Sequence, residues 1–188
     1  DFDLRLRQKL SRWSGVPTLP GLRPAKALRA LDRLSKLVAP RVQAAYFKTL
    51  WNGWCTARRF QQRGPCLLRC CPRAPDEIEH YCRCPVVANL FTRWLGLTPD
   101  FASLESFLMF KAVPSDSELT LLGIVIYAVF STTNSLRNHS PKSVEVVQDT
   151  LQQFCKSATF GHASSTKILD FAVRGRHVPV VPPPPSHP

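Results

Sequence analysis

The stretch from Cys66 to Cys84, CLLRCCPRAPDEIEHYCRC, constrains this chain more than any other part of its sequence. It contains five of the seven cysteines and one of the five histidines. Three residues separate Cys66 from Cys70, three separate His80 from Cys84, and nine join the two pairs. A hairpin in this short loop would bring three sulfur ligands and one imidazole together, which is the donor set of a zinc site.

The second pair lies where a short helix is expected. Pro75 and Asp76 are typical of a helix start, and Asp76 with Glu79 forms an Asp-x-x-Glu capping box. In that helix, His80 and Cys84 would lie one turn apart on the same face. With all four positions taken by protein ligands, one zinc ion would be structural, and its binding would stabilise the fold of this segment.

The cysteines allow other interpretations. Cys71 is an alternative ligand to its neighbour Cys70. Cys82 is an alternative to Cys84, although it follows His80 by only two residues and would point to a different helix face. Buried core packing, a disulfide and an iron–sulfur cluster are further possibilities. The charged and turn residues around the cysteines, their odd number and the lack of a cluster spacing argue against these three.

Positive charge is concentrated in the first part of the chain. The formal net charge is +12, and residues 1–75 carry 16 Lys and Arg against 3 Asp and Glu, whereas residues 76–188 carry 9 against 10. This asymmetry predicts a polyanionic partner, with RNA or DNA ahead of anionic lipid. The expected nucleic-acid-binding side chains are Arg58, Arg59 and Arg63 before the metal segment, and Lys26, Arg29 and Arg33 on an earlier helix.

Aromatic residues alternate with the arginines before Cys66. Trp51, Trp54 and Phe60 could stack on unpaired bases while guanidinium groups contact phosphates. Alternatively, these rings could pack against the metal subdomain and leave the arginines in solvent. The stripe of cations on the earlier helix has the same ambiguity, because a solvated helix face has the same pattern.

The remaining sequence predicts a mainly α protein, a small helical domain with an embedded zinc-knuckle-like metal subdomain. One helix, at about residues 117–136, is apolar on nearly all sides in its first half and is expected to be the central one. Cys155 lies in an apolar register and is expected to be core. The expected helices are 24–38, one after Pro40, one after Pro85, a short one capped by Asp100 that runs to Leu108, 117–136 behind the Ser115-x-x-Glu118 capping box, and one from Ser140.

The composition predicts five segments along the chain. They are an irregular N-terminal segment (1–23), basic amphipathic helices (24–64), the zinc-binding subdomain (65–96), a helical core (97–175) and a Pro-rich disordered tail (176–188). The longest apolar run, Leu119–Phe130, is shorter than the roughly 20 residues that cross a bilayer, so we expect no membrane partner. Reduced cysteines around a metal indicate an intracellular protein, nuclear or cytoplasmic.

Catalytic motifs are missing from the sequence. It contains no Gly-rich phosphate loop, no Gly-x-Ser-x-Gly elbow, no His-Glu-x-x-His helix and no adjoining pair of aspartates. The scattered histidines outside the metal segment have no nucleophile or carboxylate at a suggestive spacing. We therefore expect no enzymatic activity and no small-molecule substrate.

The run from Trp51 to Pro85 resembles the cysteine and histidine zinc-binding segment that follows the polymerase domain in reverse transcriptases of non-LTR retrotransposons and related retroelement-derived proteins. The resemblance implies that the four Cys and His ligands bind zinc, and that Arg58 and Arg59 face template RNA or target DNA. Departures are a first cysteine pair one residue wider than usual, two extra cysteines and a missing Asp-Asp polymerase signature. The resemblance covers about residues 45–95 and is carried by Cys66, Cys70, Asp76, Glu79, His80, Cys84 and Pro85.

This resemblance implies a non-catalytic accessory module from the C-terminal part of a larger protein. An upstream polymerase domain would then be a partner, and a chain that begins without methionine is expected of such a fragment. A second hypothesis is a zinc-stabilised protein-interaction scaffold with a proline-rich tail, in which the positive charge only aids solubility.

Overall fold

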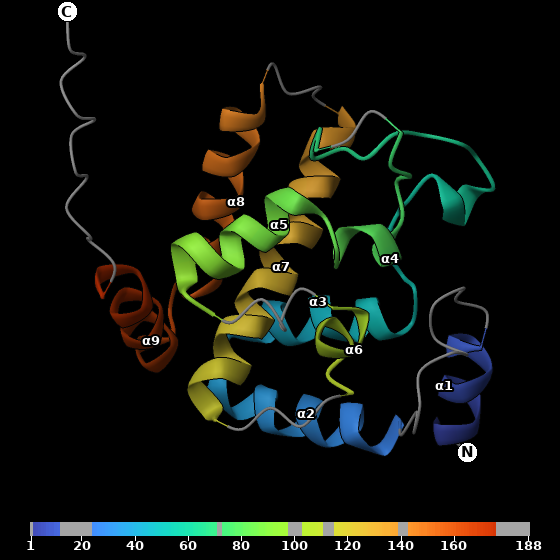
Figure 1. Ribbon diagram of the computed structural model, residues 1–188. Helices are drawn as coiled ribbons and strands as arrows, with labels where there is room; N and C mark the ends of the chain where they lie inside the picture. Colours follow the sequence, from blue (N-terminus) through green and yellow to red (C-terminus); the bar gives the residue numbers. More distant parts are fainter. Residues whose placement is uncertain are drawn as a thin grey trace, which may run out of the picture.

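A computed structural model gives the fold of this chain for residues 2–11, 24–70, 73–97, 103–110, 115–138 and 143–175 (Figure 1). The fold is mainly helical, as the sequence predicts; within the described ranges the extended backbone forms only an isolated antiparallel bridge between Pro65 and Pro75. The elements are α1 (Phe2–Leu10), α2 (Pro24–Leu37), α3 (Pro40–Leu50), η1 (Arg58–Phe60), α4 (Ile78–Tyr81), α5 (Pro85–Asn89), η2 (Leu90–Leu95), α6 (Leu104–Phe107), α7 (Asp116–Asn138), α8 (Val144–Ala158) and α9 (Ala163–Arg174).

Proline begins three of these helices. α2, α3 and α5 each start at a proline, whose fixed φ suits the first helical position and whose missing N–H would have no partner there. The helix after Pro85 continues through η2, but η2 is a π-helix, so its second half is wider than an α-helix. Gly96, with φ 64°, ends it in the left-handed conformation that glycine favours.

The long helix α7 lies at the centre of the molecule, between α2 and α3 on one side and α8 on the other (Figure 1). Its predicted capping box is confirmed: the Glu118 amide donates to Ser115 Oγ at 3.1 Å, and the Ser115 amide donates to Glu118 Oε2 at 3.2 Å. Buried side chains of α7 and of the helices packed against it form one continuous hydrophobic core. The prediction of a buried central helix is therefore confirmed.

The apolar character of α7 extends beyond the run seen in the sequence. Residues Asp116–Arg137 form a helix of 22 residues that is long and apolar enough, by length and composition, to cross a membrane. Of its most apolar window, 72% is buried inside the fold. That burial is what a core helix shows, since its apolar side chains already have protein neighbours.

Helices α2, α3 and α7 approach one another closely at Gly123. A Cβ atom at this position would lie 2.8 Å from Leu34 Cδ1 on α2 and 3.3 Å from Val42 Cγ1 on α3. Real Cβ atoms do not come within 3.0 Å of such atoms. The missing side chain of Gly123 therefore permits the packing of three helices.

Gly123→Val is expected to lower the free energy of unfolding by about 1–3 kcal/mol, because the added methyl groups overpack this crossing. Urea denaturation followed by helical circular dichroism measures the change. Ser135→Val, on an exposed position of the same helix, is the control for the helix propensity of valine. Equal stabilities of the two variants would show that α2 moves aside without loss.

The structure corrects three details of the predicted segments. Residues 2–10 form α1, whose Leu6 and Leu10 are buried, so this part of the N-terminal segment is not irregular. Helices α2 and α3 belong to the same core as residues 103–175, because their apolar faces cover α7. α9 is a further helix that the sequence analysis did not predict. The proline-rich segment 176–188 lies outside the described residues.

Candidate metal centre

Four side chains bring their ligand atoms together at the junction of two loops. The sulfur atoms of Cys66, Cys70 and Cys84 and a ring nitrogen of His80 all lie within 4.8 Å of one another. Cys70 Sγ is 3.5 Å from Cys66 Sγ and 3.2 Å from His80 Nε2. Ligand atoms around a tetrahedral zinc ion are about 3.7 Å apart, and disulfide sulfurs are about 2.05 Å apart. The cluster has the dimensions of a metal site and contains free thiols.

The first two ligands lie on a tight turn next to the Pro65–Pro75 bridge. The Cys66 amide donates to the Ala74 carbonyl at 2.7 Å, which fixes the start of this turn. Arg69 has a φ of 54°, in the left-handed region that non-glycine residues rarely adopt. Its amide donates to the Cys66 carbonyl at 3.2 Å. This reversal of the backbone returns Cys70 to the side of Cys66.

The other two ligands lie on either side of a break between two short helices. His80 is in α4, a single turn that ends at Tyr81, and Cys84 caps the beginning of α5 in an extended conformation. The prediction that both ligands share one helix face is wrong, because Pro85 starts a new helix in a different direction. Their sequence spacing nevertheless brings them together, as predicted.

The alternative ligand Cys82 lies outside the cluster. Its thiol is buried and donates to the Glu79 carbonyl at 2.9 Å. Burial raises the pKa of Cys82 to about 12, so this side chain remains a protonated thiol. The structure therefore favours Cys84 over Cys82, and the second alternative, Cys71, lies outside the described residues.

The contact between Cys66 and Cys84 shifts the pKa values of the two thiols in opposite directions. A hydrogen bond with Cys84, helped by His80 and Cys70, lowers the pKa of Cys66 to about 4 even though burial opposes it. The same contact, seen from the other side, raises the pKa of Cys84 well above its usual range, and burial adds to the rise. This contact therefore favours a thiolate on Cys66 and a protonated thiol on Cys84, and a metal ion bound by both sulfurs would displace that proton.

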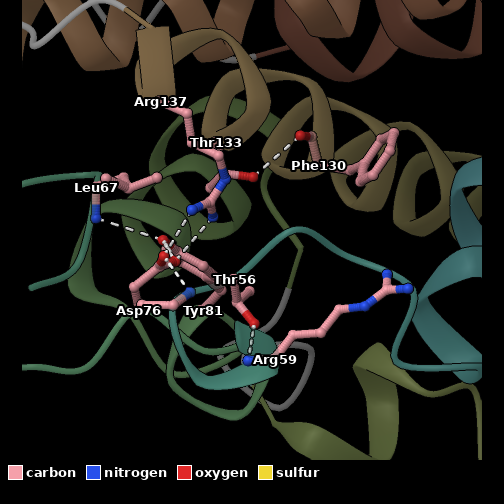
Figure 2. A network of polar contacts seen from close by, with 9 residues as sticks. Thr56, Arg59, Leu67, Asp76, Tyr81, Phe130, Thr133 and Arg137 are labelled. Carbon is pink, nitrogen blue, oxygen red and sulfur yellow. Dashed lines mark hydrogen bonds and ion pairs between the residues drawn. The ribbon is translucent and has the colours of Figure 1, made fainter. Parts of the chain in front are cut away.

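A buried carboxylate connects this region to the central helix (Figure 2). Asp76 accepts hydrogen bonds on both oxygens from the Arg137 guanidinium, at 2.9 and 3.2 Å, and from the Tyr81 hydroxyl at 2.6 Å. The Ala57 amide donates to the same carboxylate at 2.8 Å. The Asp76 side chain is only 2% exposed, so these partners replace the water that it has lost.

This network replaces the predicted capping box. The box formed by Asp76 and Glu79 is wrong: the residue before α4 is Glu77, and no side chain caps the helix there. Asp76 instead pairs with Arg137, which comes from the last turn of α7. Burial and the Asp76 carboxylate raise the pKa of Tyr81, so its hydroxyl stays a donor to Asp76. It also accepts from the Leu67 amide at 3.3 Å, in the turn between Cys66 and Cys70.

Trp54 connects the metal-binding region to the core rather than to solvent. Its ring is 1% exposed and its Nε1 donates to Thr49 Oγ1 at 3.0 Å. The ring centroid lies 6.0 Å from that of Tyr81, 6.2 Å from Phe107 and 5.5 Å from Phe130. For Trp54, the packing interpretation is confirmed and the base-stacking interpretation is wrong.

The sequence matches no protein-family model, and no curated protein or solved structure is significantly similar to it. The donor atoms of the centre and the charges around it therefore carry the functional interpretation.

The residues around the centre, 55–84, form what we call the metal unit. It contains six arginines and three acids, and all six arginines are exposed. Two acids are engaged by one arginine: Arg58 pairs with Glu77 at 3.1 Å and with Glu79 at 2.8 Å. The third, Asp76, is neutralised by Arg137. Within the described chain, no ion pair to an acid forms at the remaining five arginines, Arg59, Arg63, Arg69, Arg73 and Arg83.

The other predicted cations lie elsewhere in the fold. α2 carries Lys26, Arg29 and Arg33, and Figure 1 places α2 at the bottom of the view and the loops of the metal unit at the upper right. Lys26 is half-buried, and Arg33 pairs with Asp116 at the start of α7 at 2.6 Å. The structure does not bring these three side chains together with the arginines of the metal unit. Arg69, Arg73 and Arg83, which do lie in that unit, were not among the predicted nucleic-acid-binding residues.

Proposed function

We propose that this chain is a zinc-stabilised helical module that binds RNA or DNA, of the kind that follows the polymerase domain in non-LTR reverse transcriptases. The metal would be structural, because the four ligands fill a tetrahedral shell and leave no position for water or substrate. Three thiolates and one imidazole favour zinc over the harder cations, which prefer oxygen. Thiolate ligands that stay reduced would be expected in a nuclear or cytoplasmic protein.

The observation that carries the nucleic-acid proposal is the unbalanced charge of the metal unit. Its acids are paired internally, with Arg58 and with Arg137, and five exposed arginines have no acidic partner in the described structure. Two of them, Arg63 and Arg73, line the same hollow, together with Gln61 and Gln62. One guanidinium group can donate two parallel hydrogen bonds to a phosphate, so several arginines around one hollow suit the backbone of a nucleic acid.

A protein-interaction scaffold is the second candidate function. The observation that favours it is on α9, at the far side of α7 from the metal unit, where Phe171 is 82% exposed. Exposed aromatic side chains are enriched at protein interfaces. If the chain is such a scaffold, charge reversal in the metal unit would leave its binding to a protein partner unchanged.

The double variant Arg63→Glu/Arg73→Glu is expected to weaken RNA binding at least tenfold, because it removes two phosphate-binding side chains and adds repulsion. Fluorescence anisotropy of a labelled single-stranded RNA, titrated at several salt concentrations, measures this. The slope of log affinity against log salt should become shallower by about 0.7 for each phosphate group that the protein no longer neutralises.

Lys167→Glu is the matched control for this experiment. It changes charge at an exposed position of α9, in a part of the fold distant from the metal unit. We expect the RNA affinity of the Lys167→Glu variant to fall by less than twofold. Binding by the wild-type chain that does not depend on salt between roughly 50 and 200 mM would contradict the proposal.

A further inference from the structure

Phe60 is an aromatic side chain that the metal unit holds in solvent. It is 55% exposed, whereas the aromatic rings of Trp54 and Tyr81 are buried. Its position is fixed by the backbone: the Phe60 amide donates to the Ala57 carbonyl at 3.1 Å, and the Gln61 amide donates to the Arg58 carbonyl at 3.0 Å. The ring is therefore presented by a defined turn, η1, rather than by a loose segment.

The residues that follow Phe60 line a hollow in the metal unit. One chain segment contributes Gln61, Gln62 and Arg63 to its lining, and a second contributes Arg73 and Ala74. Its volume is about 700 Å³, within the range of roughly 300–1,000 Å³ typical of pockets for small ligands. Two carboxylates, Asp76 and Glu77, also belong to the lining, but each is already paired with an arginine, so the arginines without an acidic partner determine the charge that a ligand meets.

Backbone hydrogen bonds join the two chain segments that line the hollow. The Asp76 amide donates to the Gly64 carbonyl at 2.9 Å, and the Cys66 amide donates to the Ala74 carbonyl at 2.7 Å, so the two chain segments are paired along the bridge. The Asp76 carboxylate, held by Arg137, anchors this pairing to α7. A ligand that enters the hollow therefore meets a preformed surface and orders little of the protein on binding.

The arginines of the metal unit and the Phe60 ring together indicate the class of ligand. Arg59, next to Phe60, is held by a 2.7 Å hydrogen bond to the Gly53 carbonyl, which uses one of its five N–H donors and leaves others for a ligand. Arg63 and Arg73 add two further guanidinium groups. An exposed aromatic ring whose neighbours in the chain are an arginine and a glutamine matches a nucleotide with an unpaired base, because the base can stack and its phosphates can pair with arginine.

We infer that the metal unit binds single-stranded nucleic acid, with one unpaired base stacked on Phe60 and the neighbouring phosphates on Arg63 and Arg73. This inference rests on the proposed function and specifies its substrate class. In a duplex the base faces are stacked within the helix and cannot reach a side chain on the protein surface. Gln61 and Gln62 follow Phe60 directly in the chain and line the hollow, where their side-chain amides can offer hydrogen bonds to base edges.

Phe60→Ala is expected to weaken binding of a labelled 12-nucleotide single-stranded RNA by about 5- to 150-fold, the contribution of one base–aromatic stack. Binding of the same sequence as a blunt duplex should change by less than twofold. Fluorescence anisotropy at fixed salt measures both, and metal content and circular dichroism verify that each variant is folded. Phe60→Leu keeps an apolar side chain without a π face and should weaken binding like alanine, whereas Phe60→Trp should preserve it.

Phe160→Ala is the matched control. Phe160 is 81% exposed, on the turn between α8 and α9, so its replacement removes the same ring far from the metal unit. We expect no change in RNA affinity for this variant. Three results together would overturn the inference and leave the proposed function intact. The wild-type chain would bind single strand and duplex with equal affinity, Phe60→Ala would leave RNA affinity unchanged, and Arg63→Glu/Arg73→Glu would weaken it. No binding of either RNA form, or of the matching DNA, would overturn both.

Discussion

A chain carrying Cys66→Ser is expected to lose its metal ion and, with it, the fold of the metal unit. A serine hydroxyl is not a zinc ligand at neutral pH, so only three protein donors would remain. Structural zinc contributes roughly 10–16 kcal/mol of binding free energy in small zinc-finger peptides, comparable to the roughly 5–15 kcal/mol stability of a whole domain. Elemental analysis should find no bound metal, and thermal unfolding should lose its cooperativity.

Cys82→Ser is the matched control for the metal ligand. The Cys82 thiol is buried only a few residues from Cys84 but donates to the Glu79 carbonyl, and a serine hydroxyl can make the same hydrogen bond. This variant should retain one ion per chain, and chelation of the wild-type protein should reproduce the behaviour of Cys66→Ser. One tightly bound ion per chain in Cys66→Ser would contradict the ligand set.

The second large effect is expected at the buried ion pair. Asp76→Ala should lower the free energy of unfolding by about 3–5 kcal/mol, because the Arg137 guanidinium would remain partly buried without its carboxylate and the Tyr81 hydroxyl would lose its acceptor. Urea denaturation of the metal-loaded protein measures the change, with metal content determined in parallel to separate the ion pair from the metal centre.

Two further variants test whether the pair acts as a unit. Arg137→Met combined with Asp76→Asn should be less destabilised than the sum of the single changes, since no unpaired charge remains buried. Arg33→Met removes the exposed pair with Asp116, whose side chains are 44% and 61% exposed, and should change stability by less than about 1 kcal/mol. Equal losses for Arg33→Met and Asp76→Ala would show that burial of Asp76 has no energetic role.

Local patterns in the sequence predicted much of the fold and the four ligands. Pro24, Pro40 and Pro85 mark helix starts because a proline fits only the first turn, and Ser115 with Glu118 forms a capping box that needs no distant partner. The ligand spacing was equally informative, because a short loop limits which donors can meet. These features depend on residues close to one another in the chain.

The errors concern residues whose partners lie far along the chain. Asp76 has the sequence of a helix cap, but Arg137, 61 residues later, takes its carboxylate into the core. Trp54 lies shortly before Arg58 and Arg59 in the sequence, yet its ring packs against Phe107 and Phe130 in space. α9 escaped prediction because only Ser165 and Leu169 are buried along it, which leaves a weak apolar pattern. In each case tertiary contacts outweigh the local pattern.

The long separation between Asp76 and Arg137 has a consequence for synthesis on the ribosome. The carboxylate emerges 61 residues before its guanidinium partner, a delay of roughly 3–12 s at typical translation rates of about 5–20 residues per second. For most of that interval the four side chains of the cluster have already been synthesised and would be able to bind a metal ion. The ion pair between Asp76 and Arg137 can form only after the last turn of α7 has been made.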